Sequence, residues 1–223
     1  MTTLAVTQIR ELINASRESD LKSGALTAHL NAKAQFLHPL LALPSSHPRA
    51  ALVGFVTRYM STLPELLDAL AIELQHPPTS AALRPITALI EGYFLGPQPT
   101  AGSVPGCGSE TIAILDRAYL SYRLLEEIND RLRTCAGRPL LAIDMNFANL
   151  MVHELLGEDF ANQLDLAVHF AIESFAGEGL FDPEGELTQH LRESPGSLET
   201  FPNLLEDFAI ELVLDHSGSH PLH

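Results

Sequence analysis

Apolar residues recur at steps of three and four positions through most of the chain, and strict alternation over the length of a strand is scarce. The first pattern puts apolar side chains on one face of an α-helix, whereas alternation would put them on one face of a β-strand. We therefore predict an all-α fold, a multi-helix bundle, and no β-sheet.

The first half of the chain is predicted to form helices that are divided by glycine and proline. These helices cover about residues 3–23, 25–43, 49–62, 65–75 and 85–95. Pro48 suits the first turn of the third helix, and Pro64 is expected to kink that helix or to restart it.

Three longer helices are predicted in the centre of the chain, over residues 110–135, 139–156 and 158–176. Gly137 and Gly157 separate them, so their connections are short. Short connections favour antiparallel neighbours, and we expect these central helices to run antiparallel within the bundle.

The remainder of the C-terminal part is predicted to be irregular. Glycine and proline turns surround a short helix near residues 187–192, and a last amphipathic helix is expected over residues 204–214. The fold prediction is thus a helical bundle followed by an irregular acidic segment.

Composition limits the class of protein. With 223 residues, of which 46% are hydrophobic, the chain can bury a sizeable core. We predict one all-α domain over residues 1–223, and the loop 96–109, rich in proline and glycine, is the place for any internal boundary. No apolar run approaches the roughly 20 residues that cross a bilayer, and the N-terminus lacks the pattern of a signal peptide. We therefore expect a cytoplasmic protein with no membrane contact, in which Cys107 and Cys135 are free thiols.

The negative charge is concentrated at one end of the chain. Residues 1–138 hold 12 basic and 12 acidic residues, whereas residues 139–223 hold one basic residue, Arg192, and 16 acidic ones. All of the net charge of −15 therefore belongs to residues 139–223. Such a field repels phosphate backbones and attracts cations or basic protein surfaces, which argues against nucleic acid and for a basic partner.

Polar stripes on the three central helices are the strongest candidate for chemistry. The candidate ligands on these stripes, at helical spacing, are Glu127 (with Glu126 as the alternative), His153, His169 and Glu173. Tyr119, Asn149 and Asp165 lie on the same stripes. If the stripes converge, the four residues could supply carboxylate and imidazole ligands to a divalent metal, either iron or manganese. The alternative is that the stripes face water and that Arg123 pairs with Glu127 or Glu126.

Two other acidic motifs were considered as ion sites. The run Glu126–Asp130 resembles the clustered carboxylates that hold magnesium diphosphate, but no second aspartate-rich cluster accompanies it. Asp182–Glu193 has acids at several positions of a calcium loop, but Leu187 occupies the place of the required glycine. We interpret the latter segment as a turn that leads into a helix.

The motifs that mark common enzyme classes are absent from the sequence, including phosphate-binding loops, nucleophile elbows and the His-Glu-x-x-His zinc motif. The leading hypothesis is therefore a non-enzymatic binding or regulatory protein, chaperone-like in character, whose acidic C-terminal surface engages a basic partner. The alternative is an iron- or manganese-dependent helical-bundle enzyme that uses the four residues above as ligands. A binder of a small apolar ligand between helices is a third hypothesis.

Overall fold

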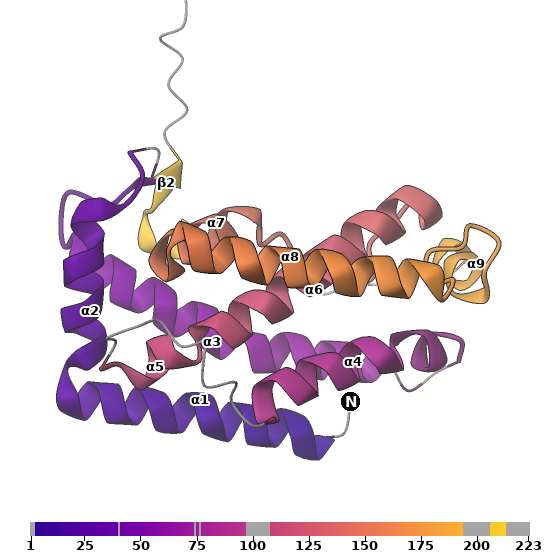
Figure 1. Ribbon diagram of the computed structural model, residues 1–223, viewed down its shortest axis with the longest axis horizontal. Coiled ribbons are helices and arrows are strands. Elements are labelled where there is room, and N and C mark those ends of the chain that lie inside the picture. Colours follow the sequence, from indigo (N-terminus) through magenta and orange to yellow (C-terminus); the bar gives the residue numbers. More distant parts are fainter. Residues whose placement is uncertain are drawn as a thin grey trace, which may run out of the picture.

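The computed structural model describes residues 3–39, 41–73, 75, 77–96, 108–193 and 206–212. This part of the chain is predominantly helical, with almost no strand, which confirms the all-α multi-helix prediction (Figure 1). In Figure 1, α8 runs along one side of the molecule and α1 along the opposite side, with α3, α4 and α6 between them.

The elements of the first half are, in chain order, α1 (Thr3–Ser23), α2 (Ala25–Lys33), the 3-10 helix η1 (Ala34–Phe36), β1 (Leu41–Ala42), α3 (Pro48–Glu73) and α4 (Thr79–Leu95). Those of the second half are α5 (Glu110–Ala113), α6 (Leu115–Ala136), α7 (Asn146–Leu156), α8 (Glu158–Gly177), α9 (Glu186–Glu193), the 3-10 helix η2 (Glu206–Phe208) and β2 (Glu211–Leu212). None of the described helices combines the length and apolar content that a bilayer crossing requires.

Helix α6 organises the packing of the bundle. It contacts α3, α4, α5, α7, α8 and α9, and most of its side chains are buried. Helices α7 and α8 also pack against each other, and Gly157, with a φ of 94°, is the single residue between them. A positive φ of this kind is easily adopted by glycine, so the chain reverses there without strain.

Four of the five helices predicted in the first half have different boundaries in the structure, among them the one expected from residue 85, which begins at Thr79. The helix expected over residues 25–43 ends at Lys33, and the chain continues into η1 and then β1. Conversely, α3 continues through Pro64 without a break, although proline removes a backbone donor from a helix. The neighbouring Leu63, Leu66 and Leu67 are fully buried, and their packing supports the helix on both sides of the proline.

Two of the three central helices also differ from the prediction, whereas α8 begins at Glu158 as expected. A break at Ile114 separates α5 from α6, where one helix was expected. The helix predicted from Pro139 begins only at Asn146, because the side chain of Asn129 binds the backbone in between. Its Oδ1 accepts hydrogen bonds from the amides of Leu140 and Leu141 at 3.0 and 3.1 Å, and its amide nitrogen donates to the carbonyl of Leu141 at 3.0 Å.

The predicted helix 204–214 is wrong for the residues that the structure describes. Residues 206–208 form the 3-10 helix η2, and Glu211 and Leu212 form β2, which pairs antiparallel with β1. Leu41 is the partner of Leu212 across this short ladder, so the expectation of no sheet also needs correction.

The same C-terminal segment packs on α3 through Phe208. A Cβ atom placed on Gly54 would come within 2.5 Å of the Phe208 ring, so only glycine leaves room for the ring at that position. Cys135 is a half-buried free thiol, while Cys107 and the loop 97–107 lie outside the described residues.

Candidate functional site

A pocket of about 540 Å³ opens where α6, α7 and α8 meet, and we call it the polar pocket. Its walls are formed by side chains from these three helices and by His38, between η1 and β1. The volume lies in the range of small-molecule sites, roughly 300–1,000 Å³, but the walls are far more polar than usual for such sites. Among these lining residues there is no serine, threonine or cysteine, so the pocket offers no hydroxyl or thiol nucleophile of those types.

Arg123 is the centre of the ion network in this pocket. Its Nη1 donates to Glu126 one turn further along α6, its Nη2 lies 3.3 Å from Oε1 of Glu127, and its Nε lies 3.0 Å from Oδ1 of Asp165 on α8. Burial alone would lower the pKa of Arg123, but the hydrogen bonds to Asp165 and Glu126 outweigh it and raise the pKa. The guanidinium therefore links two helices as a permanent cation.

Tyr119 adds a second link between α6 and α8. Its hydroxyl donates to the carboxylate of Asp165, at 3.0 and 3.1 Å from the two oxygens. Burial and the nearby charge of Asp165 raise the pKa of Tyr119 above its usual value. Tyr119 is therefore a neutral donor near neutral pH, and Asp165 is held from two sides by α6.

A chain of hydrogen bonds runs from the pocket into the core. Asn149 on α7 donates to Oε2 of Glu126 at 2.9 Å, and its own Oδ1 accepts from the hydroxyl of Tyr59 on α3 at 2.7 Å. Tyr122 in turn donates to the backbone carbonyl of Tyr59 at 2.9 Å, and the rings of these two tyrosines lie 4.5 Å apart. Glu126 is thus anchored through fully buried groups, and its exposed fraction is 8%.

The four residues predicted to bind a metal do not converge in the structure. Glu127 pairs with Arg123, Glu173 pairs with Arg131 at 2.8 Å, and the ring of His169 lies beside Phe170 with ring centroids 6.1 Å apart. Of the four, only His153 lines the polar pocket, with its Nε2 atom 3.2 Å from Oδ1 of Asn162 and 3.9 Å from Oδ2 of Asp165.

Arginines on α6 account for this outcome, because each predicted carboxylate ligand is bound by one of them. No three histidine, cysteine, aspartate or glutamate side chains in the described part of the chain are arranged to hold a metal ion. The acidic run on α6 is divided in the same way, since Asp130 pairs with Arg133 at 2.8 Å while Glu126 points to Asn149. In the segment that resembles a calcium loop, Leu187 is buried and α9 begins at Glu186, which confirms a turn leading into a helix.

The sequence predicted part of this network, including the pairing of Arg123 with Glu127 or Glu126 as the alternative to a metal site, but missed its link to the core. The helical spacing placed Tyr119, Asn149 and Asp165 on the three stripes, and the structure brings these stripes together around Arg123. The contribution of Tyr59 was missed because it lies on the apolar helix α3. A tyrosine among buried leucines is itself a signal, since its hydroxyl usually requires a partner when buried.

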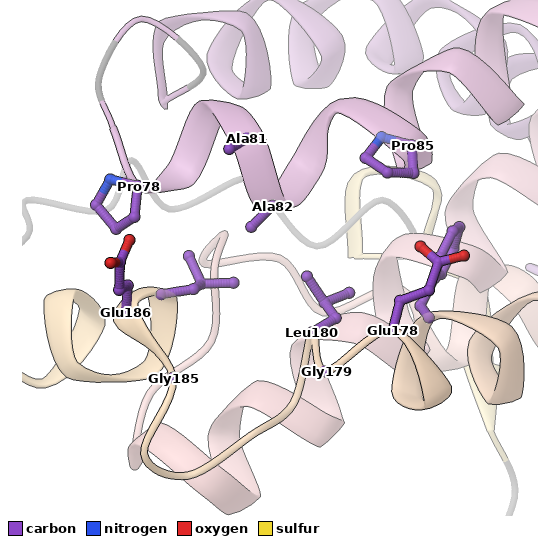
Figure 2. A pocket seen from close by; sticks show the side chains of 11 residues that line it. Pro78, Ala81, Ala82, Pro85, Glu178, Gly179, Leu180, Gly185 and Glu186 are labelled. Carbon is purple, nitrogen blue, oxygen red and sulfur yellow. The ribbon is translucent and has the colours of Figure 1, made fainter.

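A second hollow lies between α4 and the turn that joins α8 to α9, and we call it the α4–α9 groove (Figure 2). Its volume is about 270 Å³, and Ala82, Leu180 and Leu187 are among its apolar lining residues. Figure 2 shows Glu186 at the end next to Pro78 and Glu178 at the end next to Pro85, with Leu180 between them. The groove therefore combines an apolar middle with a carboxylate at each end.

The fold and these two sites define a helical-bundle protein with a polar ion network at its centre and an acidic outer surface. Searches for a matching family model, for a similar curated protein and for a similar solved structure found none. The function must therefore be argued from the geometry of the sites.

Proposed function

We propose that this protein is a non-enzymatic binding protein that engages a basic protein segment through the acidic surface of its C-terminal part. The observation that carries the proposal is the excess of unpaired carboxylates on that surface. Residues 139–193 contain one base and 11 acids, namely Asp144, Glu154, Glu158, Asp159, Asp165, Glu173, Glu178, Asp182, Glu184, Glu186 and Glu193.

Few of these acids are neutralised within the described part of the chain. Asp165 and Glu173 are the two that pair with an arginine there. The one base, Arg192, donates instead to the backbone carbonyls of Pro183 and Cys135. The surface therefore keeps a strong negative potential, which favours rapid association with a basic partner.

Apolar side chains on the same surface favour a partner that carries apolar as well as basic side chains. Phe147 and Leu150 on α7 and Leu166 and Phe170 on α8 are exposed by 39% to 64%, on the same helices that carry several of these acids. Mixed acidic and apolar surfaces match segments that combine lysine or arginine with leucine-like side chains. We place this role in the cytoplasm, where a free thiol such as Cys135 stays reduced.

The α4–α9 groove supplies a specific contact of this kind. An apolar side chain of the partner fits between Ala82 and Leu180, and basic neighbours on either side of it face Glu178 and Glu186. The proposal therefore predicts recognition of a short motif in which one apolar residue lies between basic residues.

The test measures binding of a dye-labelled pentapeptide, with leucine flanked by two lysines on each side, by fluorescence anisotropy. The unchanged protein is expected to bind it, and the double variant Glu178→Lys and Glu186→Lys is expected to bind about tenfold more weakly, since two favourable contacts of up to about 1 kcal/mol each become repulsive. A peptide with glutamates in place of the lysines should not bind.

The matched control reverses two exposed acids on α1, Glu11→Lys and Glu18→Lys, which change the net charge equally but do not line the groove. This variant is expected to bind within about twofold of the unchanged protein, because exposed charges that do not contact the peptide are screened by salt. Equal weakening by both double variants would show that net charge alone matters, and the groove would then not be the recognition element.

A further inference from the structure

One oxygen of the Glu126 carboxylate lacks the partner that its burial demands. Oε2 accepts hydrogen bonds from Asn149 and Arg123, but Oε1 is buried and no described residue donates to it. A buried acceptor without a donor is costly, more so when it carries charge. Such a group at the wall of a pocket is a place where a ligand donor gains more than water would give it.

The net charge of the side chains that line the polar pocket indicates that its ligand is positively charged. Its lining residues include the carboxylates Glu126, Glu154, Glu158 and Asp165, whereas Arg123 is the one lining side chain with a permanent positive charge. Arg123 is already shared among carboxylates, one of them Glu127 outside the pocket. The pocket therefore has an excess of negative charge that a cation would relieve.

The shape of the pocket favours an ammonium group on an alkyl stem. An ammonium carries three donors and no acceptor, so it matches carboxylate oxygens that come from different helices. Leu150, which is 39% exposed, provides apolar surface in the same pocket for the methylene stem. A space of about 540 Å³ is larger than a bare metal ion needs, which agrees with the absence of a three-ligand metal cluster among the described residues.

We propose that the polar pocket binds a primary alkylammonium group, with the Oε1 atom of Glu126 and the carboxylate of Asp165 accepting its hydrogen bonds and Leu150 contacting its stem. The torsion of a glutamate carboxylate is broad, so a small rotation of this group turns Oε1 toward the ligand. The source of the ammonium is a free alkylamine or the side chain of a lysine. This site is separate from the α4–α9 groove, and the inference does not depend on the function proposed above.

The experiment follows amide resonances of the isotope-labelled protein during titration with n-butylammonium and, separately, with Nα-acetyl-lysine amide. The neutral matches are 1-butanol and Nα-acetyl-norleucine amide, which keep the stem and remove the charge. We expect saturable shifts at Asn149, Leu150 and His153 with at least one ammonium and none with its neutral match. Equal shifts with the neutral compounds, or none with either ammonium, would overturn the proposal.

Variants on α6 separate this site from a general electrostatic effect. Glu126→Gln is expected to weaken ammonium binding about tenfold or more, because a hydrogen bond to a buried charge is lost. Glu127→Gln removes a carboxylate from the same arginine but outside the pocket, and binding should stay within about twofold. Equal weakening by the two variants would contradict the assignment, and the comparison on unchanged protein decides if Glu126→Gln does not fold.

The two ammonium probes distinguish the sources. Binding of n-butylammonium alone assigns the site to a free alkylamine, and binding of the lysine derivative as well admits a lysine of a protein partner. Pentapeptide binding that depends on Glu178 and Glu186 but not on Glu126 would leave the proposed function intact and show that this peptide does not use the polar pocket.

Discussion

The hydroxyl of Tyr59 on α3 donates a 2.7 Å hydrogen bond to Oδ1 of Asn149 on α7, and both side chains are buried. The amide nitrogen of Asn149 in turn donates a hydrogen bond to the carboxylate of Glu126. The apolar core and the polar pocket are therefore joined through one amide side chain, and loosening it affects both.

Replacement of Tyr59 by phenylalanine is expected to destabilise the fold by about 1–3 kcal/mol, since the buried Oδ1 atom of Asn149 loses its donor. Urea unfolding followed by circular dichroism measures the change. Tyr119→Phe is the matched comparison, because its acceptor Asp165 is 31% exposed and water can replace the hydroxyl. Equal losses for the two variants would show that the Tyr59 hydroxyl has no special weight.

The carboxylate of Asp20 on α1 caps the N-terminus of α5. Its oxygens accept hydrogen bonds from the hydroxyl of Ser109 at 2.7 Å and from the amides of Glu110 and Thr111 at 3.1 and 2.9 Å. Asp20→Ala should therefore cost about 1–3 kcal/mol in the free energy of unfolding, as loss of a buried helix cap does. Asp68→Ala removes an exposed aspartate that pairs with Arg10, and we expect less than about 1 kcal/mol from the same unfolding measurement.

Gly54→Ala tests the contact between α3 and the C-terminal segment. In the unchanged background the new methyl group collides with the Phe208 ring, and we expect a loss of about 1–3 kcal/mol. In a Phe208→Ala background the collision is gone, and the same substitution should stabilise α3 by about 0.5–1 kcal/mol through helix propensity.

The change of sign between these backgrounds is the observation to seek. Gly92→Ala on α4 is the control, because its new Cβ atom would have nothing within 4 Å and should be stabilising in both backgrounds. Additive effects of Gly54→Ala and Phe208→Ala would show that the ring moves aside without cost.

The raised pKa of Asp116 makes the stability of the native state depend on pH. Burial raises its pKa from 3.8 to about 6, against the lowering effects of Arg117 and of the hydroxyl of Tyr93. Between these two pH values the native state retains a proton that the unfolded chain releases, so native stability falls as pH rises through this interval. The slope is up to about 1.4 kcal/mol per pH unit, and the loss is complete above pH of about 6.

Asp116→Asn cannot ionise, so its stability relative to the unchanged protein should improve steadily from pH of about 4 to about 6 and then level off. Urea unfolding at several pH values measures the difference. Tyr93→Phe removes a hydrogen bond that lowers the pKa of Asp116, so it should move the levelling point to higher pH. A difference that is constant with pH would contradict the raised pKa of Asp116.

Helical periodicity was sufficient to predict the class of fold and the core of most helices. It failed where a side chain from elsewhere competes for the backbone, as Asn129 does at Leu140 and Leu141. This contact joins residues of two different predicted helices, so the periodicity of either helix alone does not predict it. The continuous α3 shows the opposite case, in which buried neighbours support a helix through Pro64.

The candidate site was predicted in part for a related reason. Spacing of three and four residues identified which polar side chains share a helix face, and Tyr119, Asn149 and Asp165 do meet. Spacing offered Arg123 as a partner of Glu127 but could not decide between this pair and a metal site, and it gave no sign that Arg131 binds Glu173 on another helix. Competition among partners is decided by the three-dimensional positions of Arg123 and Arg131.

The ladder between β1 and β2 pairs Leu41 with Leu212. Phe208, four residues before Leu212, packs over Gly54 of α3. Contacts between such distant positions form late, because a long stretch of chain must first be ordered. During synthesis, α3 is made long before Phe208 exists, so the surface around Gly54 stays uncovered on every unfinished chain. The closing of this contact therefore waits for the segment that carries Phe208, and until then the face of α3 around Gly54 is open to other apolar segments.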